Sequence, residues 1–64
     1  MVKINGRLLN FAGKSVSDYL KTTSYDIKRI AVEINEEIVP KSKYEETFFK
    51  DGDIVEVVSF VGGG

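Results

Sequence analysis

The C-terminal residues of this chain are the ones whose types and spacing could support chemistry. Three glycines, Gly62, Gly63 and Gly64, directly follow Val61 and end in a free carboxylate. Glycine lacks a Cβ and accepts positive φ, so such a run can enter narrow surroundings, although it cannot hold secondary structure by itself. We therefore predict a flexible arm over residues 61–64 that carries the reactive or recognised group at its tip. A frayed terminus is the simpler alternative for a glycine run.

The composition argues against most other chemistry. The 64 residues include no cysteine, histidine or tryptophan, which rules out disulfides, thiolate metal sites and catalysis by Cys or His. The formal net charge is −1 with acids and bases interspersed, so we expect no basic face for nucleic acid. No apolar run approaches the ~20 residues of a membrane span. A chain this short builds a thin core without a deep pocket. We therefore expect neither an enzyme nor a bound metal or cofactor, and the composition suits the cytoplasm.

The first eleven residues have the pattern of a hairpin. Apolar and polar side chains alternate from Val2 to Asn5, which indicates a half-buried strand. Asn5-Gly6 favours a two-residue turn because both residues tolerate positive φ. Arg7 to Phe11 should form the returning strand, and we expect Leu9 and Phe11 to face the core.

A short helix is predicted after this hairpin. Ser15 is placed to be its N-cap, with Asp18 at the third helical position to complete a capping box. A helix would bring three apolar residues onto one face, at positions i, i+3 and i+4, namely Val16, Tyr19 and Leu20. Beyond the helix, Ile27 is the residue that we expect to plug the core.

The second half of the chain reads as two strands, a loop and a last strand. Ile30 to Ile34 alternates, Asn35-Glu36 should turn the chain, and Glu37 to Val39 should form a short strand. Pro40 indicates that this strand ends there or lies at a sheet edge. We expect a loop over residues 41–50, anchored by Tyr44 and by Phe48 or Phe49. Asp51-Gly52-Asp53 is a tight turn, because the further ligands of a metal loop are missing.

The last strand, expected over residues 54–61, is apolar on both faces, as in a central strand. We expect Val55 and Val57 to pack under the helix. Val58 and Phe60 would then lie beside Glu56 on a less covered face. Such a patch would be a docking surface, unless Tyr44, Phe49 or the long loop folds over it, and the sequence leaves these alternatives open.

The element order predicts an α+β fold of the β-grasp type. It would be a mixed sheet of four to five strands with one main helix packed on one face. The first and last strands would lie side by side and parallel at the centre, with the helix in the crossover between them. Residues 1–60 would form this one domain, and residues 61–64 the arm.

With these elements in place, the chain resembles the ThiS family of sulfur carrier proteins of thiamin biosynthesis, which is related to ubiquitin-like proteins and to the small subunit of molybdopterin synthase. The resemblance spans nearly the whole chain. It rests on four segments in order: Val32-Glu33-Ile34-Asn35, Glu37 to Ser42, Asp51 to Val58, and Val61 to Gly64. One residue departs from the pattern, since Glu36 stands where the family usually has glycine, which puts the turn type in question.

The resemblance implies a chemistry for the C-terminus. In such proteins a ThiF-like partner uses ATP to adenylate the terminal carboxylate, and sulfur from a sulfur donor protein then replaces the adenylate. The resulting thiocarboxylate gives its sulfur to a ThiG-like thiazole synthase. By position, the reacting group is the carboxylate of Gly64. Gly62 and Gly63 form the arm, and Val61, Phe60 and Val58 are the candidates for partner binding. ATP is consumed by the partner and is not a bound cofactor.

Other functions remain open at this point. A molybdopterin-type carrier or a ubiquitin-like protein modifier would use the same tail and the same activation. A β-grasp module that binds a ligand or RNA would have no need of terminal glycines, and such modules usually continue into another domain, which the chain end at Gly64 disfavours.

Overall fold

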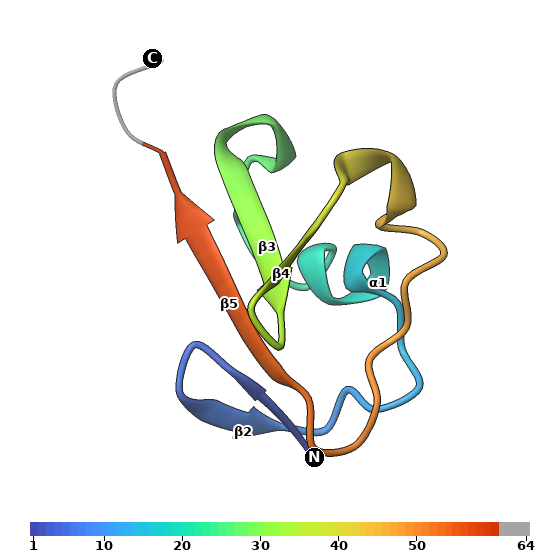
Figure 1. The fold of residues 1–64 in the computed structure, drawn as a ribbon. Coiled ribbons are helices and arrows are strands. Elements are labelled where there is room, and N and C mark those ends of the chain that lie inside the picture. The colour runs from blue at the N-terminus through green and yellow to red at the C-terminus, as the bar shows by residue number, and fades with distance from the viewer. Residues whose placement is uncertain (61–64) are drawn as a thin grey trace.

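Residues 1–60 are described by a computed structural model, and they fold into one five-stranded sheet with a short helix against it (Figure 1). The strands are β1 (Val2–Ile4), β2 (Arg7–Leu9), β3 (Ile30–Ile34), β4 (Glu37–Val39) and β5 (Ile54–Ser59). The helix α1 spans Val16–Leu20, and 3-10 turns occupy Ile27–Arg29 and Lys41–Lys43.

The strand order in the sheet is β2-β1-β5-β3-β4. Strands β1 and β5 are parallel, and every other neighbouring pair is antiparallel. The first and last strands therefore lie side by side at the centre, and α1 lies in the connection between β1–β2 and β3. This arrangement confirms the predicted α+β, β-grasp architecture with one main helix on one face. Within residues 1–60, no helix is long and apolar enough to span a membrane.

The helix α1 begins where its capping residues place it. The Asp18 N–H donates to Ser15 Oγ (3.0 Å), and the Ser15 N–H donates to Asp18 Oδ2 (3.3 Å), which completes the predicted capping box. Hydrogen bonding of the Asp18 carboxylate to the Ser15 backbone N–H, and next to the Ser15 side chain, lowers the pKa of Asp18 below its ordinary value. Such caps satisfy amide groups that have no partner inside the helix. A five-residue helix still depends on tertiary packing, because isolated short helices are unstable in water.

The core fills the space between α1 and the sheet. Its buried members come from α1, from the inward faces of the three strands β1, β3 and β5 and from the loop before β5: Val2, Ile4, Val16, Tyr19, Leu20, Ile30, Val32, Tyr44, Phe49, Val55 and Val57. Leu9 and Phe11 pack against this cluster, as predicted. The Tyr19 ring meets Phe11 and Phe49 edge-on, with centroid separations of 5.1 and 6.2 Å, the arrangement that aromatic quadrupoles favour.

The structure corrects one prediction about the loops, that for Ile27, and settles the choice between Phe48 and Phe49 that the sequence left open. Ile27 is not a core plug, because it begins a 3-10 turn at the surface and is 45% exposed. Of the two neighbouring phenylalanines, Phe49 is buried and Phe48 is exposed. The loop before β5 is held by the Phe49 N–H, which donates to the Lys14 carbonyl (2.9 Å), and the Phe49 ring packs against Tyr19 of α1.

Candidate functional site

Strand β5 leads directly to the predicted reactive tail. Val61, Gly62, Gly63 and Gly64 lie outside the described residues, so their roles stay predictions. The last described residue, Phe60, is tied to the sheet because its N–H donates to the Arg29 carbonyl (2.7 Å). The tail therefore starts from a fixed point beside the beginning of β3.

Two asparagines fix β5 in its place between β1 and β3. Both occupy hairpin turns at positive φ, 50° for Asn5 and 52° for Asn35. The Asn5 side chain bonds both backbone groups of Val57: its Oδ1 accepts from the N–H (2.8 Å) and its Nδ2 donates to the carbonyl (3.3 Å). Asn35 Oδ1 accepts from the Ile54 N–H (3.0 Å). The Asn5 amide thus continues the β1–β5 ladder beyond the paired residues Ile4 and Val55.

The turn at residues 35–36 keeps its tight form despite the departure from the family pattern. Glu36 has φ of 70°, next to Asn35 at 52°. Two consecutive positive φ angles characterise the turn that joins antiparallel strands with a two-residue loop. Glu36 therefore adopts a left-handed conformation that glycine would adopt without steric cost.

Among residues 1–60, no helix packs on one of the two faces of the sheet, and we call this the open face. Side chains alternate along β5, so Val55 and Val57 point toward α1 and are buried, as predicted, while Ile54, Glu56 and Val58 point to the open face. Val58 is 48% exposed, and Phe60 just beyond β5 is 55% exposed. Tyr44 and Phe49 do not cover them, because both rings are buried in the core.

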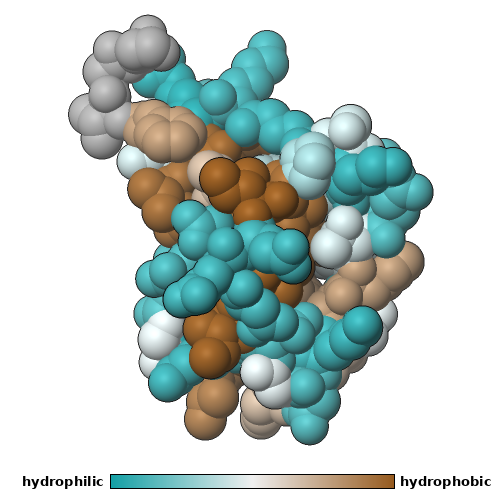
Figure 2. All heavy atoms as spheres, in the orientation of Figure 1, coloured by the Kyte–Doolittle hydropathy of each residue, from teal (hydrophilic) through white to brown (hydrophobic). Residues whose placement is uncertain are grey.

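The open face carries further exposed apolar residues besides Val58 and Phe60, the two that the sequence analysis singled out. Ile54 on β5, Ile38 on β4 and Leu8 on β2 are also exposed, at 56, 70 and 66%. Their cross-strand partners Lys3 and Glu33 show that they lie on this same face. Figure 2 shows apolar surface interrupted by a band of hydrophilic side chains. Patches of this kind, apolar and rimmed by charge, are typical of docking surfaces.

Glutamates at the middle of the open face were not among the predicted site residues. Glu33 on β3 lies directly opposite Glu56 on β5. Together with Glu36 they line a hollow that also includes Ile54 and Asn35. Each of these residues could be placed on an outward face from its own strand pattern. Only the cross-strand register, which the sequence pattern does not give, brings the carboxylates together.

These carboxylates do not form a metal site. Within residues 1–60, no three His, Cys, Asp or Glu side chains gather closely enough to hold a metal ion. The ion pairs among the described residues join Met1 to Asp51, Asp26 to Arg29, and Lys43 to Glu46, and none involves the glutamates of the open face. The middle of this face therefore carries negative charge without an internal counterion.

These features define a class of protein: a small β-grasp domain with an open sheet face, whose central strand is followed in the sequence by a run of glycines. The ThiS family model matches residues 2–64. Sulfur carrier protein ThiS of Bacillus subtilis is 35% identical over the full length of both chains, and ThiS of Thermus thermophilus is 34% identical, again over both full lengths. The crystal structure of ThiS from Geobacter metallireducens superposes with a TM-score of 0.78 at 28% identity, covering 98% of this chain and 97% of that one.

The chain belongs to the ThiS family, the sulfur carrier proteins of thiamin biosynthesis. A longer relative adds a further fact. A protein named thiazole synthase in Paramagnetospirillum magneticum contains a segment 47% identical to 95% of this chain, and the match spans 19% of that protein. The carrier domain thus also occurs joined to other sequence in one polypeptide.

Proposed function

We propose that this protein carries sulfur as a thiocarboxylate on Gly64, formed after a ThiF-like partner adenylates the carboxylate, and that it donates this sulfur to thiazole synthase. The observation that supports the proposal is that the central strand of a β-grasp sheet is followed directly by Val61 and three glycines. The chain also belongs to a family of sulfur carriers. The proposed partner uses ATP, and we propose that the reaction takes place in the cytoplasm.

The chemistry follows from the nature of a carboxylate. The Gly64 carboxylate attacks the α-phosphorus of ATP, and pyrophosphate leaves. A sulfur nucleophile at the sulfide level then adds to the activated carbonyl, the bond to AMP breaks, and a thiocarboxylate remains. Glycine presents no side chain to obstruct this attack. The chain contains no cysteine, and a thiocarboxylate carrier needs none because the sulfur is held on the terminal carbonyl.

Thiazole synthase as the acceptor has independent support. In the Paramagnetospirillum magneticum protein of that name, a segment similar to this chain is part of the same polypeptide. Domains that are joined in one organism commonly act together when they are separate, because fusion raises the effective concentration of one for the other.

The body of the protein must contribute to partner binding. Ordering the four residues of the arm inside a partner would cost roughly 4–8 kcal/mol of backbone entropy, so the arm alone would bind weakly. Val58 and Phe60 are our candidates for the docking contact, because both are exposed beside the start of the arm. Replacing both with serine should weaken partner binding while the protein stays folded. Unchanged affinity in a folded variant would remove these residues from the docking surface.

The experiment that tests the proposal is intact mass spectrometry after incubation with ATP, the cognate adenylating enzyme and a sulfur source. We expect a mass gain that matches one oxygen exchanged for sulfur. A chain lacking Gly64 should show no gain, and a Glu37→Gln variant, altered on the opposite face of the sheet, should react normally. An active adenylating enzyme that leaves the wild-type mass unchanged would refute the carrier chemistry. Isopeptide adducts on lysines would instead indicate a protein modifier.

A further inference from the structure

The glutamate pair at the middle of the open face is unfavourable for the free protein. Glu33 and Glu56 are direct cross-strand partners, and like charges in that position destabilise a sheet. Glu33 is also half-buried, so water screens its charge less than it would on a fully exposed residue. Folding alone would favour a neutral or oppositely charged residue at one of these positions.

The surroundings of the pair match a positively charged side chain from another protein. The hollow is lined by three acidic residues, Glu33, Glu36 and Glu56, together with Asn35 and the aliphatic Ile54. A guanidinium or ammonium group would find acceptors on more than one side, and its aliphatic stem would find Ile54. Apolar contacts continue on the same face through Val58.

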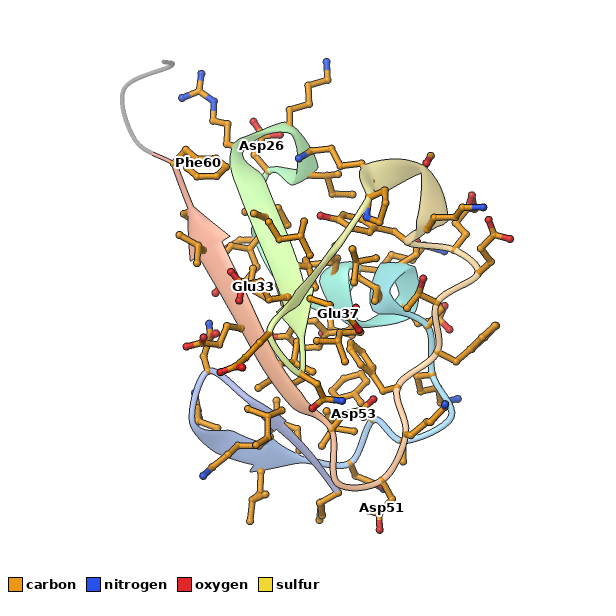
Figure 3. The ribbon with its side chains drawn as sticks, viewed as in Figure 1. Asp26, Glu33, Glu37, Asp51, Asp53 and Phe60 are labelled. Atoms are coloured by element: carbon orange, nitrogen blue, oxygen red, sulfur yellow. The ribbon has the colours of Figure 1, made fainter. Side chains whose placement is uncertain are left out.

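The hollow is continuous with the exposed surface that runs along β5 to Phe60, the last residue before the arm. Every second residue from the middle of β5 onward is exposed on the open face, and these residues are Glu56, Val58 and Phe60. Glu33 and Phe60 both lie along this side of β5 and β3, whereas Glu37 belongs to β4 and faces away from the hollow (Figure 3). A partner that receives the tail would therefore cover the glutamate pair at the same time.

We propose that the open face docks onto thiazole synthase through an arginine or lysine of that enzyme, which enters the hollow between Glu33 and Glu56 while apolar side chains of the enzyme cover Val58 and Phe60. This rests on the proposed function, and it adds the chemistry of the partner surface. Thiazole synthase is the chosen occupant because a related carrier segment lies within a protein of that name. In this arrangement the pair serves recognition at the expense of stability.

The proposal makes stability and binding change in opposite directions. A Glu33→Gln/Glu56→Gln double variant should melt at a higher temperature than the wild type, because the repulsion is gone. The same variant should bind the cognate thiazole synthase about tenfold or more weakly, since the partner's cation would be left unpaired. Loss of binding in a more stable protein cannot be explained by misfolding.

Two further variants sharpen the test. Glu56→Lys should raise the melting temperature, because Lys at this position can pair with Glu33, and it should weaken binding more than the glutamine variant by repelling the partner's cation. Glu37→Gln removes the same charge from the same β3–β4 hairpin, but outside the hollow, and should leave affinity unchanged. Wild-type binding should weaken as NaCl is raised, and this dependence should be smaller in the double variant.

Isothermal titration calorimetry with separately expressed thiazole synthase provides the affinities. The proposal is overturned if the double variant changes affinity no more than Glu37→Gln does. It is equally overturned if the double variant binds thiazole synthase normally and loses only the adenylating enzyme. Failure of the proposed function is distinguishable, because the intact-mass assay asks whether wild-type Gly64 acquires sulfur and does not depend on which face docks.

Discussion

The two faces of the sheet are built on opposite principles. The covered face carries Ile4, Val32, Val55 and other apolar residues that are almost fully buried beneath α1 and the loop before β5. The open face carries exposed apolar residues in direct contact with water and a pair of glutamates placed against each other. Both faces belong to the same strands, since successive residues of β5 alternate between them.

The covered face accounts for the stability of the domain, whereas the open face is suited to recognition of a partner. Burial of apolar area drives folding, and the covered face supplies that burial. Exposed apolar residues gain nothing for the free protein, and a like-charge pair opposes folding. The exposed apolar residues and the glutamate pair therefore fit a face that a partner protein covers when it binds.

The largest expected contrast comes from the same truncation made in two places. Phe49→Ala should lower the free energy of unfolding by about 3–5 kcal/mol, because it empties a site at the centre of the core. Phe49 is 2% exposed, whereas Phe60 is 55% exposed. Phe60→Ala should therefore change stability by about 0.5 kcal/mol or less. Urea unfolding of both variants measures the contrast. Equal losses would mean that Phe60 contributes to the core and that the two faces are not distinct.

The second prediction concerns the strand that both faces share. Asn5→Gly preserves the positive φ without strain but removes the side chain that bonds both backbone groups of Val57. We expect a loss of about 1–3 kcal/mol, because partly buried polar groups lose their partners. Asn5→Asp keeps the acceptor for the Val57 N–H but not the donor for its carbonyl, so its melting temperature should fall between those of Asn5→Gly and the wild type. If Asn5→Gly were as stable as the wild type, the hydrogen bonds from the Asn5 side chain to Val57 would not stabilise β5.

A third, smaller effect is expected at the edge of the open face. Glu36 holds φ of 70°, and a left-handed residue with a side chain costs roughly 1–2 kcal/mol. Glycine removes that cost but has greater freedom in the unfolded chain. Glu36→Gly should therefore raise stability by about 1 kcal/mol or less. Chemical denaturation measures this gain. If Glu36→Ala, which loses the carboxylate but keeps the Cβ, gave the same gain, charge relief and not backbone strain would be the cause.

The smallest effect is a pH dependence on the covered side. Hydrogen bonds from Ser15 hold the pKa of Asp18 below its ordinary value of 3.8. A group whose pKa is lower in the folded state stabilises the protein above its unfolded value and loses this contribution as the pH falls through the folded value. Asp18→Asn should therefore melt below the wild type at neutral pH, and the gap should close as the pH drops below 3.8. Melting curves across this range test it, and a gap that stays constant with pH would show that charge at Asp18 does not matter.

Much of the fold could be predicted because its signals are local. The Asn5-Gly6 turn, the Ser15 and Asp18 capping box and the alternation of Ile30 to Ile34 each depend on residues within a few positions of one another. The structure confirms all of them. Even the placement of Val55 and Val57 beneath the helix followed from alternation together with one apolar helix face.

The wrong prediction for Ile27 and the choice between Phe48 and Phe49, which the sequence left open, share a physical reason. Ile27 and Phe48 are apolar residues in irregular segments, where no repeat indicates which side chain turns inward. The inward placement of Phe49 goes with a contact between residues far apart in the chain, because the Phe49 N–H donates to the Lys14 carbonyl. A local pattern carries no record of such contacts.

The amino-acid sequence by itself determined the five strands and the main helix, their β-grasp order and the candidate reactive carboxylate of Gly64, because these depend on short-range periodicity and on residue chemistry. Only the tertiary structure decided that Val58 and Phe60 stay uncovered and that Glu33 lies opposite Glu56. The glutamates are 23 residues apart in the chain, and their meeting depends on the register between β3 and β5. Register is a property of two strands packed on a common core, so it arises only when the whole domain has folded.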